Sequence, residues 1–170
     1  NALFADGSAA VLIEAQPRAG INLKPESFYC DLALSGEKDM AWTVGDLGFE
    51  MRLSSYVPGI IKKGIHELTA SLLSQIQTEF SEISYFAIHP GGKKILEAME
   101  EALGLSKKQN EYAYHVLRNF GNMSSPTVLF VLDELRKHLR PEDHDKKILS
   151  VAFGPGLTLE SMILSIHHHA

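Results

Sequence analysis

The sequence predicts an α/β domain in which strands and helices pack in layers. Apolar residues recur at helical spacing between residues 57 and 76, whereas residues 83–88 form a short apolar run that ends at a histidine and two glycines. Two further apolar runs, joined by a glycine-rich turn, close the chain. This order of strands, helix, strand, helices and two strands is typical of layered α/β folds. The length of 170 residues, 45% of them hydrophobic, suits one domain with a sizeable core.

The first third of the chain has strand character. Small residues lead into the apolar stretch Val11-Leu12-Ile13, which predicts a strand near the amino terminus. Three more short strands are predicted over residues 27–34, 40–44 and 47–53, separated by turns that contain glycine. Together these three predict a local antiparallel excursion.

The remaining elements follow from changes in periodicity. Pro58, in the first turn of the long apolar pattern, fits the start of a helix that extends to about residue 76. The charged stretch 140–146 predicts a linker between a helix and a strand. From residue 83 onward the sequence predicts a strand over 83–88, helices over 93–103, 107–118 and 126–138, and strands over 147–153 and 157–166.

Charge and hydropathy exclude two classes of partner. The formal net charge is −5 and the basic residues are scattered in short pairs, so we expect no nucleic-acid partner. No apolar run approaches the roughly 18 residues of a bilayer span, so we expect no membrane partner either. The amino terminus lacks the basic and apolar pattern of a secretory signal. We therefore expect a cytoplasmic protein.

Neither the cysteine nor the terminal histidines predict a functional site. Cys30 is the single cysteine, and it lies in a predicted strand and not at a strand-to-helix turn that would stabilise a thiolate, so we expect a packing or surface role. His167, His168 and His169 are adjacent on a predicted strand. Adjacent strand residues point to alternating faces, so the three imidazoles cannot converge and we expect no metal site.

His89 and Asn122 are the candidates for chemistry. His89 stands where an apolar strand ends, at the edge at which α/β folds bind ligands, and the following glycines allow close approach to the backbone. Asn122 lies in a run of small and polar residues just before a helix. Each residue also has a purely structural interpretation, as a buried histidine bonded to the backbone or as an ordinary Gly-Asn turn.

An imidazole and a carboxamide suit one kind of chemistry if they meet. When both donate a hydrogen bond to the same oxygen, they form an oxyanion hole that carries no net charge. Such a pair stabilises an enolate, as formed when a malonyl thioester loses carbon dioxide. A nucleophile that holds the growing acyl chain is still required.

Four motifs resemble the signatures of the chalcone and stilbene synthases, which are type III polyketide synthases. They are Phe4-Ala5-Asp6-Gly7-Ser8-Ala9-Ala10, His89-Pro90-Gly91-Gly92, Gly121-Asn122-Met123-Ser124-Ser125 and Phe153-Gly154-Pro155-Gly156-Leu157-Thr158. The resemblance implies that residues 1–170 form the carboxy-terminal half of a duplicated, thiolase-like fold. It also implies a homodimer, and it assigns the nucleophilic cysteine to an amino-terminal half that is absent from this chain.

The resemblance also implies roles for individual residues. His89 and Asn122 would activate and stabilise the malonyl thioester, and His89 would keep the cysteine of the other half as a thiolate. The loop residues Gly91 and Gly92, with Lys94, would lie near the pantetheine of coenzyme A. The substrate pocket would be lined by Phe4, Met51, Ser124, Phe153, Gly154, Pro155 and Gly156.

The implied function is that of an acyltransferase that condenses malonyl-coenzyme A onto an acyl-coenzyme A starter, with no cofactor besides these thioesters. Three positions depart from the plant pattern: Ala5 and Ala152 stand where glycine is usual, and Met51 stands where a gating phenylalanine is usual. The starter unit therefore cannot be transferred from the plant enzymes. Two alternatives remain. A related 3-oxoacyl carrier-protein synthase usually has Gln-Ala-Asn after its histidine, which is absent here, and the other alternative is a non-catalytic binding or assembly domain.

Overall fold

The computed structural model describes residues 3–169 and confirms the predicted α/β class. Within these residues, four strands form one mixed sheet in the order β1-β6-β5-β4. The pairs β1–β6 and β6–β5 are antiparallel, whereas β5 and β4 are parallel. The strands are β1 (Gly20–Leu32), β4 (Ile83–Ile88), β5 (Lys147–Gly154) and β6 (Thr158–His169).

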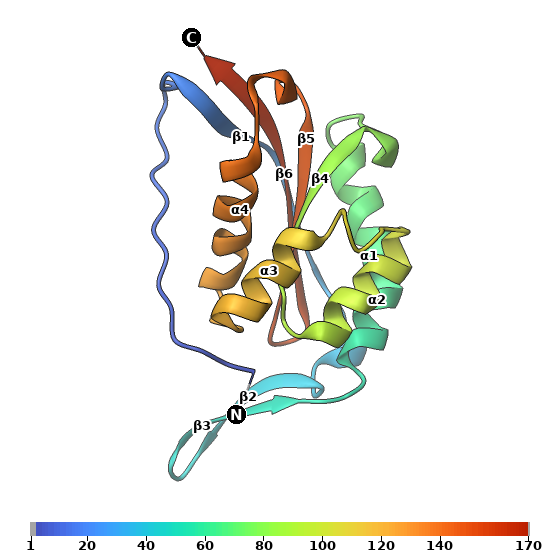
Figure 1. The fold of residues 1–170 in the computed structure, drawn as a ribbon. Coiled ribbons are helices and arrows are strands. Elements are labelled where there is room, and N and C mark those ends of the chain that lie inside the picture. The colour runs from blue at the N-terminus through green and yellow to red at the C-terminus, as the bar shows by residue number, and fades with distance from the viewer. Residues whose placement is uncertain (1–2, 170) are drawn as a thin grey trace.

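Helices cover both sides of this sheet (Figure 1). On one side α1 contacts β1 and β6 and packs along α2, and on the other side α4 contacts β4 and β5 and packs against α3. Among the helices of the described chain, none combines the length and the apolar character needed to span a membrane. Their bounds are α1 (Val57–Ser74), α2 (Lys93–Leu103), α3 (Glu111–Phe120) and α4 (Pro126–His138).

The core forms where the predicted apolar faces meet the sheet. Ile61, Ile65 and Leu68 recur at helical spacing in α1 and are completely buried, as the periodicity predicts. Phe86 and Ile148 bury the centre of the sheet between the helical layers. The expected helix over 107–118 begins later, at Glu111. Before it, Ser106 and Gln109 close a tight turn by bonding each other through backbone and side-chain groups.

The strand predicted over residues 27–34 is longer than expected and belongs to the main sheet. β1 begins at Gly20 and pairs along the whole length of β6, from Gly20 opposite His169 to Leu32 opposite Thr158. The prediction of a local excursion was therefore wrong for this strand. Pro25 lies within β1 beside a break in register, a position that an edge strand tolerates because proline lacks a backbone donor.

The strand predicted at Val11-Leu12-Ile13 was wrong. These three residues have no strand pairing, and their side chains are between 64% and 82% exposed. Strand propensity reflects packing against neighbouring strands more than an intrinsic backbone preference, so an apolar run alone does not make a strand. In Figure 1 this segment runs along the outside of the domain.

The other two strands predicted in this region, β2 (Met40–Gly45) and β3 (Gly48–Leu53), form a separate antiparallel hairpin. The hairpin projects from one end of the domain (Figure 1). Several of its apolar side chains face solvent, with Val44 84% exposed and Phe49 76% exposed. Trp42 pairs across the strands with Met51 and makes an edge contact with the ring of Phe49.

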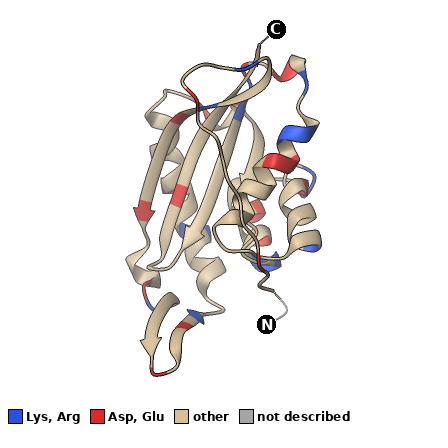
Figure 2. Cartoon of the chain, turned by 90° about the vertical axis from the view of Figure 1, so that its left-hand side faces the viewer, with Lys and Arg blue, Asp and Glu red and all other residues tan. Residues whose placement is uncertain are grey.

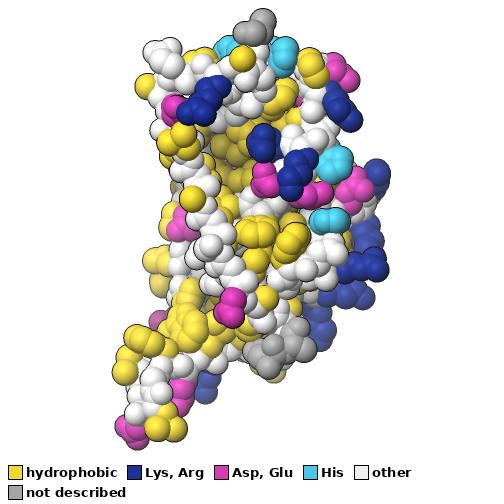
Figure 3. Space-filling view, turned by 60° about the vertical axis from the view of Figure 1, so that its left-hand side comes forward, with side chains coloured by type: hydrophobic (Ala, Val, Ile, Leu, Met, Phe, Trp, Pro, Cys, Tyr) yellow, Lys and Arg dark blue, Asp and Glu magenta, His cyan; other side chains and the backbone are white. Residues whose placement is uncertain are grey.

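One face of β1 and β6 is left open beside α4. Ser27 of β1 bonds Gln75 at the end of α1, so alternation along the strand turns Phe28, Cys30 and Leu32 to the opposite face. All three are exposed, which confirms the surface alternative for Cys30. Figure 2 shows few Lys, Arg, Asp or Glu positions along the strands of this sheet. In Figure 3 apolar side chains gather there in a hollow and continue onto the hairpin.

Candidate active site

His89 lies at the carboxyl end of β4, where the sequence predicts a ligand-binding edge. Its backbone N–H donates to the carbonyl of Val151 at 2.8 Å, so it continues the parallel pairing of β4 with β5. The side chain is only 6% exposed. Burial lowers the pKa of His89 from its ordinary 6.5 to about 4 because a charged imidazole is poorly solvated there. The imidazole is therefore neutral at pH 7.

Asn122 is held by the amino-terminal segment of the chain. Its N–H donates to the carbonyl of Leu3 at 2.9 Å, and its own carbonyl accepts from the N–H of Ala5 at 2.9 Å. This short parallel bridge places Phe4 beside Asn122. Gly121 makes the close approach feasible: its φ is +73°, and a Cβ there would lie 3.1 Å from the Cβ of Ala5. The motifs around residues 4 and 121 thus form one packed unit.

The start of α4 fixes the other side of the Asn122 loop. The buried Thr127 hydroxyl accepts from the N–H of Met123 at 2.8 Å and donates to the carbonyl of Ser124 at 2.7 Å. Ser124 adopts a left-handed backbone conformation with φ of 64°, which is uncommon outside glycine. Its N–H donates to the Oδ1 atom of Asn122 at 2.9 Å and so sets the orientation of the carboxamide.

The side chains of His89 and Asn122 meet at Gly91. The Nδ2 atom of Asn122 donates to the Gly91 carbonyl at 3.2 Å, which uses one of the two hydrogens of the amide. The ring of His89 lies against the same residue, since a Cβ on Gly91 would stand 3.7 Å from the imidazole Nε2. Both side chains border one cavity. The structure therefore brings the two candidate residues together.

The cavity has a volume of about 830 Å³ and lies at the carboxyl ends of β4 and β5 and at the start of β6. Every residue to which the family resemblance assigned a catalytic or binding role lines this cavity, except Gly156. The N–H of Gly156 donates to the carbonyl of Met40 and so ties the closing turn to the hairpin. The predicted residues that line the cavity are Phe4, Met51, His89, Gly91, Gly92, Lys94, Asn122, Ser124, Phe153, Gly154 and Pro155.

Sequence reasoning missed several residues of the cavity wall. Trp42 lines it from the hairpin, and the pairing of Trp42 with Met51 on one face could have indicated this. Thr158 and Glu160 line it from β6. Their places depend on register, because Thr158 pairs with Gly154 and Glu160 with Ala152 across the sheet. That register is not visible in the sequence.

An uncharged imidazole and a carboxamide at one end of a largely apolar cavity define a class of site. Both groups can donate hydrogen bonds to a developing oxyanion without trapping a carboxylate as an ion pair. Such a pair suits a site at which an enolate oxygen develops from a thioester.

The comparisons with known proteins identify the family. The C-terminal domain of the chalcone and stilbene synthases matches residues 31–167, and the chain belongs to this family. A curated relative, "Probable polyketide synthase 1" of Dictyostelium discoideum, is 34% identical over 175 residues, which cover 96% of this chain and 5% of that protein. The chain therefore spans a small part of this relative.

Solved structures of type III polyketide synthases show the same fold and confirm the predicted thiolase-like arrangement. The C-terminal type III domain of the Dictyostelium hybrid Steely1 matches with a TM-score of 0.82 and 32% identity, over 96% of this chain and 46% of that one. PKS-I of the brown alga Ectocarpus siliculosus matches with a TM-score of 0.79 and 26% identity, over 89% and 41%. A fungal type III enzyme matches with a TM-score of 0.73 and 30% identity, over 88% and 42%.

Proposed function

We propose that this chain supplies the oxyanion-stabilising part of a type III polyketide synthase site that condenses malonyl-coenzyme A onto an acyl-coenzyme A starter. The observation that carries the proposal is the meeting of His89 and Asn122 at Gly91, on the wall of one cavity. The low pKa of His89 keeps the imidazole neutral, so it donates a hydrogen bond without adding a charge. The second amide hydrogen of Asn122 serves the same thioester oxygen.

In the proposed reaction the malonyl thioester loses carbon dioxide, and the electron pair of the broken carbon-carbon bond becomes an enolate. His89 and Asn122 donate hydrogen bonds to the enolate oxygen. The enolate carbon then attacks the acyl thioester, and the thiolate of the acyl carrier leaves. No resident cofactor takes part in this sequence, and coenzyme A thioesters are the substrates. Lys94 lines the cavity together with Gly91 and Gly92, and in this proposal it contacts coenzyme A.

The acyl-carrying cysteine belongs, in this proposal, to an amino-terminal half that covers the open sheet face. The exposed apolar side chains Phe28 and Leu32 support a protein partner on that face. We further propose that the complete protein is a homodimer, as the family resemblance implies, and that it is cytoplasmic. The 170-residue chain alone is expected to form no condensation product, because Cys30 lies on the open face and is not among the residues of the cavity wall.

Release of labelled carbon dioxide from malonyl-coenzyme A tests the proposal in the complete protein. We expect His89→Ala and Asn122→Ala each to lower the rate by about 10²- to 10³-fold, the effect of removing one oxyanion donor. His66→Ala serves as the matched control, because His66 is an exposed residue of α1 outside the cavity. Undiminished release in both cavity variants would contradict the assigned roles. If the wild type releases carbon dioxide from malonyl carrier protein but not from malonyl-coenzyme A, the carrier-protein synthase alternative is favoured. If it releases carbon dioxide from neither donor, a non-catalytic domain is favoured.

A further inference from the structure

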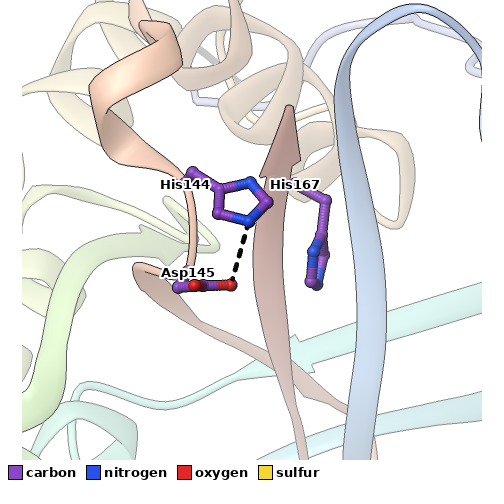
Figure 4. Close-up of side chains that lie close together, drawn as sticks. All are labelled: His144, Asp145 and His167. Carbon is purple, nitrogen blue, oxygen red and sulfur yellow. Dashed lines mark ion pairs between the residues drawn. The ribbon is translucent and has the colours of Figure 1, made fainter. Parts of the chain in front are cut away.

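A second group of polar side chains lies outside the cavity, near the end of β6. His144 and Asp145 come from the connection between α4 and β5, and His167 comes from β6 (Figure 4). One potential ligand atom from each residue lies within 4.8 Å of the others. Alternation along β6 turns His168 away from His167 and His169, whose rings stack with centroids 6.2 Å apart. The partners of His167 come instead from a loop 22 residues earlier in the chain.

The loop that carries His144 and Asp145 is anchored on both sides. The N–H of Asp145 donates to the carbonyl of Ile166 at 2.8 Å, and the N–H of Ile166 donates to the carbonyl of Lys146 at 2.9 Å. The buried Asp143 accepts a hydrogen bond from the hydroxyl of Tyr85 at 2.7 Å. The expected linker over residues 140–146 is therefore a fixed connection. Asp145 itself has a left-handed φ of 66°, an uncommon conformation that often marks functional positions.

His167 is oriented by neighbours that favour ligation through one ring nitrogen. Its Nε2 atom lies 2.9 Å from the hydroxyl of Ser165, and that hydroxyl donates its own hydrogen to Glu26 at 2.5 Å. Because the hydroxyl hydrogen is used, Nε2 must be the donor and Nδ1 carries the lone pair. Histidine ligands of metal ions are commonly held in this way, through a hydrogen bond from the second ring nitrogen.

His144 has a different arrangement. Its Nδ1 atom accepts from the backbone N–H of His168 at 2.9 Å, and its Nε2 atom lies 3.4 Å from Oδ1 of Asp145. In the neutral ring the hydrogen is therefore on Nε2, between the imidazole and the carboxylate. A metal ion at Nε2 would move this hydrogen to Nδ1 and break the bond to His168. Binding at this site is thus coupled to a small change at the end of β6.

We propose that His144, Asp145 and His167 bind one divalent ion of the zinc type and so clip the α4–β5 connection to the end of β6. Two imidazole nitrogens and one carboxylate oxygen suit zinc, with water as the fourth ligand, whereas Mg²⁺ prefers oxygen ligands alone. Bonds of about 2.0–2.1 Å place tetrahedral ligand atoms roughly 3.3 Å apart, so the cluster must close by about 1.5 Å. Rotation of exposed side chains can achieve this closure, since His144 is 45% exposed and Asp145 is 76% exposed.

Calorimetric titration of the protein, stripped with EDTA and carrying no added histidine tag, with ZnCl₂ tests this proposal. We expect one ion per chain and no binding of Mg²⁺. His144→Gln and Asp145→Asn should each weaken the affinity about tenfold or more, and asparagine is chosen because it tolerates the left-handed conformation. Ser165→Ala should weaken it about 10- to 100-fold by releasing His167. His66→Gln changes an exposed histidine of α1 that is not part of the cluster, so this variant should bind like the wild type.

Two further measurements make the result decisive. Zinc should raise the melting temperature of the wild type but not that of Asp145→Asn, and Co²⁺ should give the visible absorption of a four-coordinate site in the wild type alone. Circular dichroism of each variant without metal establishes that it is folded. The proposal is overturned if zinc does not bind saturably below millimolar concentration. It is equally overturned if His144→Gln and Asp145→Asn bind like the wild type while His169→Gln does not, because the terminal histidines would then be the ligands.

Discussion

The two walls of the cavity differ in how they are held. The wall with His89 and Asn122 is buried. Backbone hydrogen bonds tie these residues to β5 and to the amino-terminal segment, and the Asn122 side chain accepts from the N–H of Ser124. The wall formed by the β2–β3 hairpin is paired with itself and exposes side chains such as Phe49. Groups that carry out chemistry need fixed geometry, whereas groups that shape a pocket tolerate exchange. Under the proposed function, the residues that bind the thioester oxygen and the residues that shape the pocket therefore lie on separately held walls.

The largest effect on activity is expected when the Asn122 side chain changes its chemistry but not its shape. Asn122→Asp keeps the size of the side chain but replaces the donating amide by a carboxylate that repels the enolate. In the complete protein we expect decarboxylation of malonyl-coenzyme A to fall by at least about 10²- to 10³-fold. Met51→Leu on the hairpin is the control, with an expected change below about threefold. Equal losses of decarboxylation rate in the two variants would contradict the distinction between the fixed wall and the hairpin wall of the cavity.

The pH dependence of stability tests the burial of His89. Its pKa is about 4 in the folded chain against an ordinary 6.5, so between these values the unfolded state binds more protons. Stability should therefore fall as the pH is lowered from 6.5 to 4, by about 3 kcal/mol, and should lose nothing more from this group below pH 4. Chemical denaturation of the wild type and of His89→Gln at several pH values measures the difference. A variant with the same pH dependence as the wild type would refute this account of His89.

Substitution of Gly121 tests whether the Asn122 loop depends on close packing. In Gly121→Ala the new methyl group would lie 3.1 Å from the Cβ of Ala5, and the alanine would have to adopt a φ of +73°. We expect the free energy of unfolding to fall by about 1–3 kcal/mol. Gly59→Ala in α1 is the matched control, because a Cβ there meets no atom within 4 Å. Replacement of an exposed helical glycine by alanine should raise the free energy of unfolding by about 0.5–1 kcal/mol. Unfolding midpoints that shift in the same direction for both variants would contradict the prediction.

The smallest effect is expected on the hairpin. Phe49→Ala removes a side chain that is 76% exposed, so the free energy of unfolding of the chain should change by less than about 0.5 kcal/mol. Phe86→Ala, in the core and 2% exposed, should cost about 3–5 kcal/mol. The single tryptophan, Trp42, touches Phe49 and reports the hairpin by fluorescence. A loss of stability for Phe49→Ala comparable with that for Phe86→Ala would show that the hairpin is part of the core.

Local signals in the sequence predicted the helices and pointed to the candidate residues for the proposed chemistry. The apolar spacing of Ile61, Ile65 and Leu68 predicted α1 because a helix presents every third or fourth residue to the core. His89 and Asn122 stood out because each follows an element end at which glycines open the backbone. Steric and periodic constraints of this kind act within a few residues, so a single sequence displays them.

Contacts between distant segments were decided by the tertiary structure alone. The sequence did not show that β1 pairs along β6, that Leu3 and Ala5 hold Asn122, or that His144 and Asp145 meet His167. Val11-Leu12-Ile13 resembled a strand and is not one, because a strand is stabilised by its neighbours and not by its own residues. The sequence thus determined which residues are candidates for the proposed chemistry, and only the packing of the sheet and its helices decided where they meet.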